Sequence, residues 1–190
     1  LNSEATIAHA VSTINSGLHG VVFFGSTGQS QLIDLNSKKD LISKASNHKL
    51  RKQFIFGTGC NSLRDTIDLI KYGMEYGFKH WLVGCPAYYT GNTEEGVYNY
   101  YENIIAKTPN IKIILYNFEK LFSFLFKPEF VKKLASDFPK NIIGVKDSSY
   151  NLYETLKISN FLIFPGSEAK LLKSLELGCA GTISAITQVT

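Results

Sequence analysis

Lys146 is the strongest candidate in the sequence for covalent chemistry. It directly ends a short apolar run, residues 142–145, so its stem is expected to point into or along a fold built from buried strands. Burial penalises an ammonium and favours the neutral amine, and a neutral amine attacks a ketone to form an imine. Two alternatives remain: a lysine whose ammonium reaches water from a strand end, or a lysine paired with Asp147.

Two further features could assist such an amine. Tyr116 ends another apolar run, and a phenol beside an imine can carry the protons of its formation and breakdown. Residues 25–29 read Gly-Ser-Thr-Gly-Gln, a turn whose backbone N–H groups could bind a carboxylate. The hydroxyls of Ser26 and Thr27 could add hydrogen bonds or pass a proton to Tyr116. The alternatives are a rim aromatic bonded to a backbone carbonyl and an ordinary turn with a serine cap.

The elements that must position these residues follow one repeating pattern. Seven apolar runs are too short for helices, are rich in β-branched and aromatic residues, and do not alternate with polar residues, which is typical of strands buried on both faces. They are residues 21–24, 54–56, 81–83, 111–116, 142–145, 161–164 and 182–185. Amphipathic stretches with helical spacing lie between them, and Thr93, Pro128 and Ser167 are expected to start helices.

Strands that alternate with helices predict a β/α architecture, either an open doubly wound sheet or a barrel. In a TIM (β/α)8 barrel the active site lies at the C-terminal ends of the strands, where Lys146 and Tyr116 are expected. A barrel needs eight strands, and seven are predicted. We therefore expect one barrel domain over residues 1–190, with the first strand and the C-terminal helices missing, and residues 3–16 as a helix that follows the absent strand.

Composition restricts the classes of function. The chain of 190 residues is 44% hydrophobic and 19% charged, as in globular proteins, and its net charge of +4 comes from scattered lysines and arginines. These features argue against a nucleic-acid partner, and no apolar run approaches the roughly 20 residues of a membrane helix. Neither the histidines nor the cysteines have the spacing of metal ligands. The first predicted strand is not followed by the glycine-rich turn of dinucleotide-binding proteins. The N-terminus lacks the pattern of a signal peptide. The three cysteines fit a reducing cytoplasm.

Taken together, these motifs resemble those of the dihydrodipicolinate synthase/N-acetylneuraminate lyase superfamily. That group of Schiff-base-forming pyruvate aldolases includes 2-keto-3-deoxygluconate aldolases. The shared segments, in order and approximate spacing, are residues 25–28, Pro86 with Tyr88 and Tyr89, Glu95 with Gly96, Tyr116 with Asn117, residues 144–147 and residues 181–184. The similarity runs over essentially the whole chain.

The resemblance implies roles for individual residues. Lys146 matches the Schiff-base lysine, Tyr116 the proton-shuttling tyrosine, and Ser26 the hydroxyl that links it to a second tyrosine. That second tyrosine is Tyr89, which in many members reaches into a neighbouring subunit. The expected substrate-binding positions are Thr27, Gly28, Gly166 and Ile183. The implied activity needs no cofactor. It joins pyruvate or another 2-keto acid to an aldehyde, or cleaves the product of that reaction. The resemblance also implies that the full-length protein is a homotetramer.

The segment after Tyr116 and Asn117 departs from the family pattern. Residues 118–121 read Phe-Glu-Lys-Leu, where dihydrodipicolinate synthases have Pro-Ser-Arg. A bidentate guanidinium that grips a carboxylate is not replaced by Lys120. The resemblance thus leaves two enzyme activities open, a sugar-acid aldolase and a 4-hydroxy-tetrahydrodipicolinate synthase. A non-catalytic protein that binds keto acids or sugar acids on the same fold is the alternative.

Overall fold

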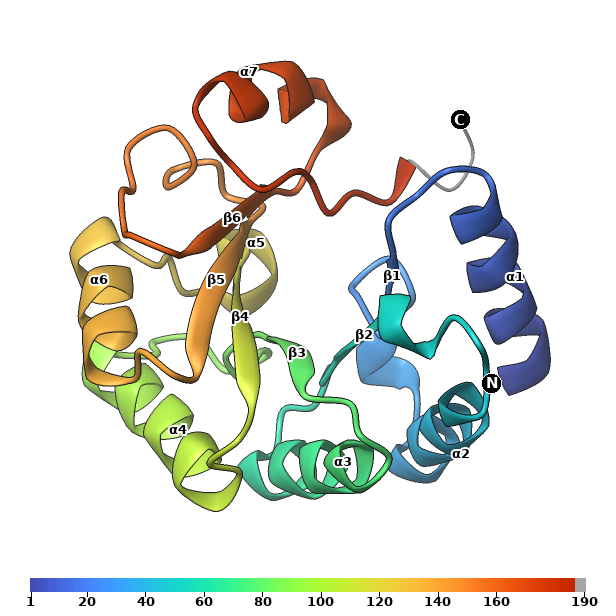
Figure 1. Cartoon of the computed structure of the whole chain (residues 1–190). Coiled ribbons are helices and arrows are strands. Elements are labelled where there is room, and N and C mark those ends of the chain that lie inside the picture. Colours follow the sequence, from blue (N-terminus) through green and yellow to red (C-terminus); the bar gives the residue numbers. More distant parts are fainter. Residues whose placement is uncertain (187–190) are drawn as a thin grey trace.

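The computed structural model describes residues 1–186, and its six strands form one parallel sheet in the order β1-β2-β3-β4-β5-β6. The strands are β1 Val21–Phe23, β2 Phe54–Gly57, β3 His80–Val83, β4 Lys112–Asn117, β5 Ile142–Asp147 and β6 Leu162–Pro165. The sheet curves like the wall of a barrel, and the helices lie along its outer side (Figure 1).

The strand order decides between the two architectures that the sequence left open. In a doubly wound sheet the order reverses at a switch point, whereas a barrel adds each new strand beside the previous one. Every neighbouring pair from β1 to β6 is consecutive in the chain and parallel. The predicted barrel architecture is therefore confirmed.

Four of the α-helices begin at polar caps, and the predicted helix starts at Thr93 and Pro128 are confirmed. Asn2, Asp34, Ser62 and Thr93 each accept a hydrogen bond from a backbone N–H of the first helical turn, and Pro128 opens a helix where its missing N–H costs nothing. The α-helices are α1 Ser3–Asn15, α2 Leu35–Ser46, α3 Leu63–Glu75, α4 Glu94–Lys107, α5 Glu119–Phe122, α6 Pro128–Asp137 and α7 Leu171–Glu176. Short 3-10 helices are η1 Ser30–Leu32, η2 Arg51–Gln53 and η3 Glu168–Lys170. Ser167 caps η3 as predicted.

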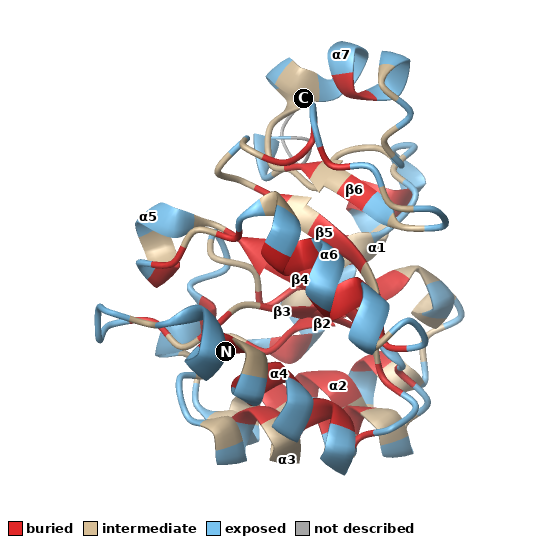
Figure 2. Cartoon of the chain, turned by 90° about the vertical axis from the view of Figure 1, so that its left-hand side faces the viewer, coloured by how far each residue is buried: buried red, intermediate tan, exposed pale blue. Residues whose placement is uncertain are grey.

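The core lies between the sheet and the surrounding helices. Trp81 of β3 and Phe56 of β2 are fully buried, and their ring centroids are 5.9 Å apart. Phe78, just before β3, packs edge-on against Phe56 at 4.8 Å. The strands are largely buried, while the outer faces of the helices are exposed (Figure 2). Within residues 1–186, no helix is long and apolar enough to cross a bilayer.

The prediction of a seventh strand at residues 182–185 is wrong, because the structure has no strand there. Within this segment a single backbone hydrogen bond reaches β6, from Ile183 N–H to Pro165 O, and a second comes from Ala180 N–H, just before the segment, to Ile163 O; each is 3.1 Å long. Gly181, between Ala180 and the segment, has a φ of +140°, which few residues other than glycine adopt. The described residues therefore contain six strands and not the seven predicted.

A second correction concerns the connection from β5 to β6. The sequence pattern predicts helices between strands, but residues 148–161 form turns and irregular structure without an α-helix. Tyr150 and Asn160 both have positive φ, at +60° and +58°, which no right-handed helix accommodates. This irregular segment lies beside Lys146 and contributes to the cavity described below.

Candidate active site

Lys146 and Tyr116 meet because their strands are in register. Tyr116 of β4 pairs with Lys146 of β5, so both side chains leave the sheet at the same level. Lys146 Nζ lies 3.4 Å from Tyr116 Oη and 4.5 Å from the centre of the phenol ring. The lysine is partly buried, and its amine lies against the phenol. The structure thus brings the two strand-end residues together as the sequence predicted.

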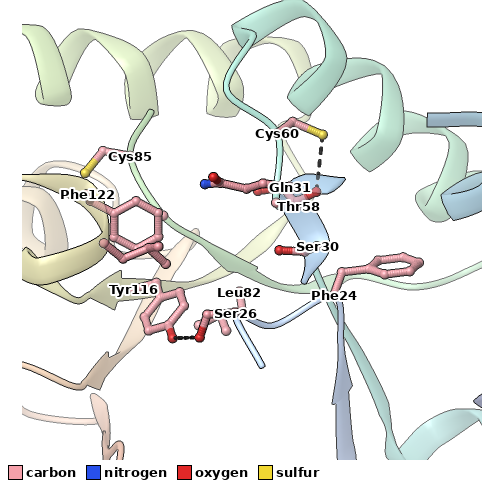
Figure 3. Close-up of a pocket in the computed structure, with 13 residues that line it drawn as sticks. Phe24, Ser26, Ser30, Gln31, Thr58, Cys60, Leu82, Cys85, Tyr116 and Phe122 are labelled. Carbon is pink, nitrogen blue, oxygen red and sulfur yellow. Dashed lines mark hydrogen bonds between the residues drawn. The ribbon is translucent and has the colours of Figure 1, made fainter. Parts of the chain in front are cut away.

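Ser26 extends this pair into a chain of three groups. Its Oγ lies 2.9 Å from Tyr116 Oη, across the barrel interior from β4 (Figure 3). Tyr116 is only 5% exposed, and the ring of Phe122 packs edge-on against it at 5.3 Å. The phenol is held between an amine and a hydroxyl, so it can pass a proton in either direction.

A cavity of about 520 Å³ opens above the amine. Its lining residues are Ser26, Thr27, Tyr116, Phe118, Glu119, Lys120, Lys146, Ser148, Ser149, Tyr150, Gly166 and Ala185. A volume of this size accommodates a small organic substrate. Ser26 and Tyr116 also line a second cavity of about 20 Å³, which has room for one water molecule (Figure 3).

The turn that carries Ser26 also offers free donors to the large cavity. The turn is closed by a hydrogen bond of 3.0 Å from Gln29 N–H to Ser26 O. Among residues 1–186, the N–H groups of Thr27 and Gly28 donate to no protein group, and Thr27 lines the cavity. Two unused amides in one turn can bind a carboxylate. Gly28, also predicted to bind substrate, is not among the residues that line the cavity.

Gly166 lies close against Ser148, where a larger residue would require movement. A Cβ on Gly166 would lie 2.3 Å from Ser148 Oγ, because the ends of β5 and β6 approach closely there. Gly166 lines the large cavity as the sequence predicted, and its N–H donates to Asp147 O. Ile183 is not in the cavity lining, although it lies next to β6 through its bond to Pro165 O.

Tyr89 lies apart from the other predicted site residues. It is 80% exposed beside Tyr88, whose ring is perpendicular to it at 5.0 Å. Within residues 1–186, no contact joins Tyr89 to Ser26 or Tyr116. The described chain therefore does not bring Tyr89 together with the other predicted catalytic residues.

Asp147 is not the partner of Lys146 that one alternative proposed. Successive residues of a strand point to opposite faces, so Asp147 leaves β5 on the side away from the amine. No ion pair joins the two residues in the described part of the chain. The Asp147 carboxylate accepts hydrogen bonds from Asn117 Nδ2 and from three backbone N–H groups instead.

Metal ligands and acidic thiols do not gather around this site. Residues 1–186 contain no group of three histidine, cysteine, aspartate or glutamate side chains that could hold a metal ion. Cys85 lines the small cavity, and burial raises the pKa of its thiol to about 12. A thiol that stays protonated is a poor nucleophile. Lys146 remains the nucleophile that the geometry favours.

Comparison with known proteins identifies the family. The model of the dihydrodipicolinate synthetase family matches residues 1–190. The chain belongs to this family. A relative from Sulfurihydrogenibium sp. (strain YO3AOP1), named 4-hydroxy-tetrahydrodipicolinate synthase, is 32% identical over 182 residues, which are 93% of this chain and 61% of the relative.

Other members of the dihydrodipicolinate synthetase family differ in their named activity. A Picrophilus torridus protein named 2-dehydro-3-deoxy-D-gluconate/2-dehydro-3-deoxy-phosphogluconate aldolase is 32% identical over 168 residues, 86% of this chain and 61% of its own length. A prophage protein of E. coli K12 that belongs to the dihydrodipicolinic acid synthase family was solved in complex with pyruvate. Its TM-score is 0.88 at 28% identity, over 99% of this chain and 65% of that one. The chain thus spans less than two thirds of the relatives' length.

Several residues of this family member's site were not identified from its sequence. Ser148 and Ser149 line the cavity, although the sequence pattern assigned them no role. Tyr150 also lines it, and its place shortly after Lys146 in the sequence makes contact with substrate one possibility. The signal available was their position directly after the strand that carries Lys146, because barrel sites are built from such loops. The contribution of Asp147 had no comparable signal, since it depends on the path of the backbone after β5.

Proposed function

We propose that this chain provides the catalytic centre of a class I aldolase or lyase that forms a Schiff base between Lys146 and pyruvate or another 2-keto acid. One observation carries the proposal: Lys146 Nζ, Tyr116 Oη and Ser26 Oγ form a continuous chain at the floor of the large cavity. The free amides of Thr27 and Gly28 are the proposed site for the substrate carboxylate. Gly166 forms part of the cavity wall.

The groups that form the imine are in place. The Lys146 amine adds to C2 of the keto acid, and Tyr116 donates the proton with which the hydroxyl leaves as water, which gives the imine. Removal of a proton from C3 gives an enamine, and C3 then attacks the aldehyde carbon while the aldehyde oxygen takes up a proton. Water hydrolyses the product imine and frees the amine. The same steps in reverse cleave a keto acid into pyruvate and an aldehyde.

The substrate is proposed from the cavity wall. Lys120 and Glu119 line the cavity after β4, and no arginine lies among its lining residues within residues 1–186. A carboxylate-bearing aldehyde would therefore lack a bidentate partner there. A sugar-acid aldolase fits this wall better than a 4-hydroxy-tetrahydrodipicolinate synthase, although both act through the same imine.

The proposal extends to assembly and location. Tyr88 and Tyr89 are 84% and 80% exposed, and such a pair of rings is the kind of surface that contacts another protein. We propose a homo-oligomer in which Tyr89 of one copy reaches the Ser26 hydroxyl of another. Analytical ultracentrifugation tests this, because Tyr89→Ala should shift the protein toward the monomer. A cytoplasmic location is proposed from the three free cysteines.

A turnover screen tests the activity. Candidate 2-keto-3-deoxy sugar acids are incubated with the protein, and pyruvate release is followed by reduction with lactate dehydrogenase. We expect turnover that Lys146→Arg abolishes, since a guanidinium keeps the charge but forms no imine. Thermal stabilisation by these acids without any pyruvate release would instead support the non-catalytic binding protein.

A further inference from the structure

Asp147 organises the irregular segment that follows β5. Its carboxylate is completely buried and accepts four hydrogen bonds. Oδ1 accepts from Asn117 Nδ2 at 2.8 Å and from Tyr150 N–H at 2.9 Å. Oδ2 accepts from Leu152 N–H at 2.8 Å and from Tyr153 N–H at 3.0 Å. A carboxylate has acceptor sites for all four donors, so the path of residues 148–153 is fixed by this one side chain.

Tyr150 is held by this network in an unfavourable backbone conformation. Its φ is +60°, a region that glycine adopts freely and that a bulky aromatic residue rarely occupies. Strained residues of this kind persist where the surrounding structure determines them, and they concentrate at ligand sites. Asp147 accepts the N–H of Tyr150 itself and those of Leu152 and Tyr153, so the backbone is held both at the strained residue and directly after it.

The strain places an aromatic side chain at the cavity. Tyr150 is 40% exposed and lines the large cavity. The ring of Tyr153 packs perpendicular to it at 6.5 Å, and Lys170 Nζ lies 5.8 Å from its centre. A glycine at this position would satisfy the backbone without strain but would leave this part of the wall open. The tyrosine is therefore better explained by what enters the cavity than by the fold.

The neighbouring wall indicates what that ligand is. Ser148 and Ser149 contribute hydroxyls beside Tyr150, and Glu119 and Lys120 face the same cavity from α5. Ser149 Oγ accepts the N–H of Glu119 at 2.8 Å, which joins the two segments. Hydroxyl, carboxylate and ammonium groups next to an aromatic ring match a carbon chain that carries hydroxyl groups, whose C–H faces pack on the ring while its hydroxyls find hydrogen-bond partners.

We propose that Tyr150 is a specificity-determining residue that contacts the hydroxylated carbon chain of the aldehyde substrate, and that Asp147 is the residue that positions it. This inference rests on the proposed aldolase function and adds the class of aldehyde and the residue that selects it. The reacting carbons stay with Lys146 and Tyr116. Asp147 acts only through the backbone of residues 148–153.

Tyr150→Gly separates a functional role from a structural one. If the tyrosine is kept for the ligand, glycine relieves strain, so the midpoint of thermal unfolding should stay the same or rise. The ratio of kcat/KM for D-glyceraldehyde over propanal, each with pyruvate, should fall at least tenfold. A lower unfolding midpoint together with an unchanged ratio would overturn the proposal, because Tyr150 would then serve the fold alone.

Asp147→Asn tests the positioning role. In asparagine, an amide nitrogen that donates hydrogen bonds replaces one of the two carboxylate oxygens. The two N–H groups that were bonded to that oxygen therefore lose their acceptor. We expect faster amide hydrogen exchange at Tyr150, Leu152 and Tyr153, and a KM for D-glyceraldehyde raised at least fivefold with a smaller change in kcat. Asp68→Asn, on the exposed face of α3, is the matched control and should change neither. Unchanged exchange or unchanged KM in Asp147→Asn would contradict the role.

Trapping with pyruvate and borohydride distinguishes the two levels of the proposal. If the parent protein gives no covalent pyruvate adduct, the proposed aldolase function fails. If the parent gives the adduct but Tyr150→Gly keeps the full preference for D-glyceraldehyde, only the role of Tyr150 fails. An adduct in the parent together with a lost preference in the variant supports both.

Discussion

The amine of Lys146 lies 3.4 Å from the phenol oxygen of Tyr116, on paired positions of two adjacent parallel strands. This relationship follows from strand register, because residues at the same level of neighbouring strands leave the sheet side by side. The centre of the site is therefore built on paired strands of the sheet. Loops add the hydroxyl of Ser26 and the free amides of Thr27 and Gly28.

Removing the phenol hydroxyl tests the proton-transfer role of Tyr116. Tyr116→Phe keeps the ring and its packing against Phe122 but loses the group between the amine and Ser26. We expect kcat to fall by about 10²- to 10⁴-fold, the range of general acid–base catalysis. Steady-state kinetics measure this, and circular dichroism should show an unchanged fold. Unaltered kcat would exclude Tyr116 from the proton path.

Ser26 is expected to have a smaller effect, because it acts on the lysine only through Tyr116. Ser26→Ala removes one neutral hydrogen bond, which is worth about 1 kcal/mol, so kcat should fall by roughly fivefold. Ser26→Thr keeps the hydroxyl and should retain most of the activity. Equal losses in the two variants would show that the size of the side chain, and not its hydroxyl, limits turnover.

Gly166→Ala tests the close approach of β5 and β6. The added Cβ would lie 2.3 Å from Ser148 Oγ and 3.1 Å from Ser148 Cα, so the backbone must shift. Overpacking of this kind costs about 1–3 kcal/mol in the free energy of unfolding, measurable by urea denaturation. Gly25→Ala is the matched control, since no atom lies within 4 Å of its added Cβ. Similar stability of the two variants would contradict the packing.

Because its thiol is buried, Cys85 should make the folded protein less stable at alkaline pH. Burial raises the pKa of its thiol from 9.0 to about 12, so the folded state favours the neutral thiol. Below pH 9 the thiol is protonated in both the folded and the unfolded state, and the stability of the fold does not depend on its ionisation. As pH rises from 9 toward 12, the thiol ionises only in the unfolded state, so the free energy of unfolding falls. Each pH unit in that window removes at most about 1.4 kcal/mol.

The corresponding measurement is urea denaturation from pH 8 to pH 11. Cys85→Ala should start less stable, because it leaves space beside the small cavity, but its stability should fall less steeply above pH 9. Identical slopes in the parent and the variant would show that Cys85 does not ionise on unfolding in this range.

Much of the barrel and the centre of its site could be predicted from the sequence. Buried strands without alternation and capped amphipathic helices are local patterns, and Lys146 and Tyr116 stand at strand ends. Lys146 could not be separated from a pair with Asp147 by sequence spacing alone. Strand alternation resolves that question once both residues are known to lie within β5.

The irregular parts could not be predicted, because they depend on contacts between distant residues. The Asp147 carboxylate accepts the N–H groups of Tyr150, Leu152 and Tyr153, which holds this segment in turns instead of a helix. The spacing of hydrophobic residues in the sequence does not reveal these hydrogen bonds. The predicted strand at residues 182–185 fails for a similar reason, since its pairing with β6 is limited to the hydrogen bond from Ile183 N–H to Pro165 O. Tyr89 matches a family motif, yet in the described chain it is exposed and lies apart from Ser26 and Tyr116.

Borohydride trapping tests the central role of Lys146 most directly. The protein is incubated with pyruvate, reduced with sodium borohydride, digested and analysed by mass spectrometry. We predict one pyruvate-derived adduct on the peptide that contains Lys146, and none in Lys146→Arg. An adduct at another lysine, or an equal adduct in Lys146→Arg, would contradict the account.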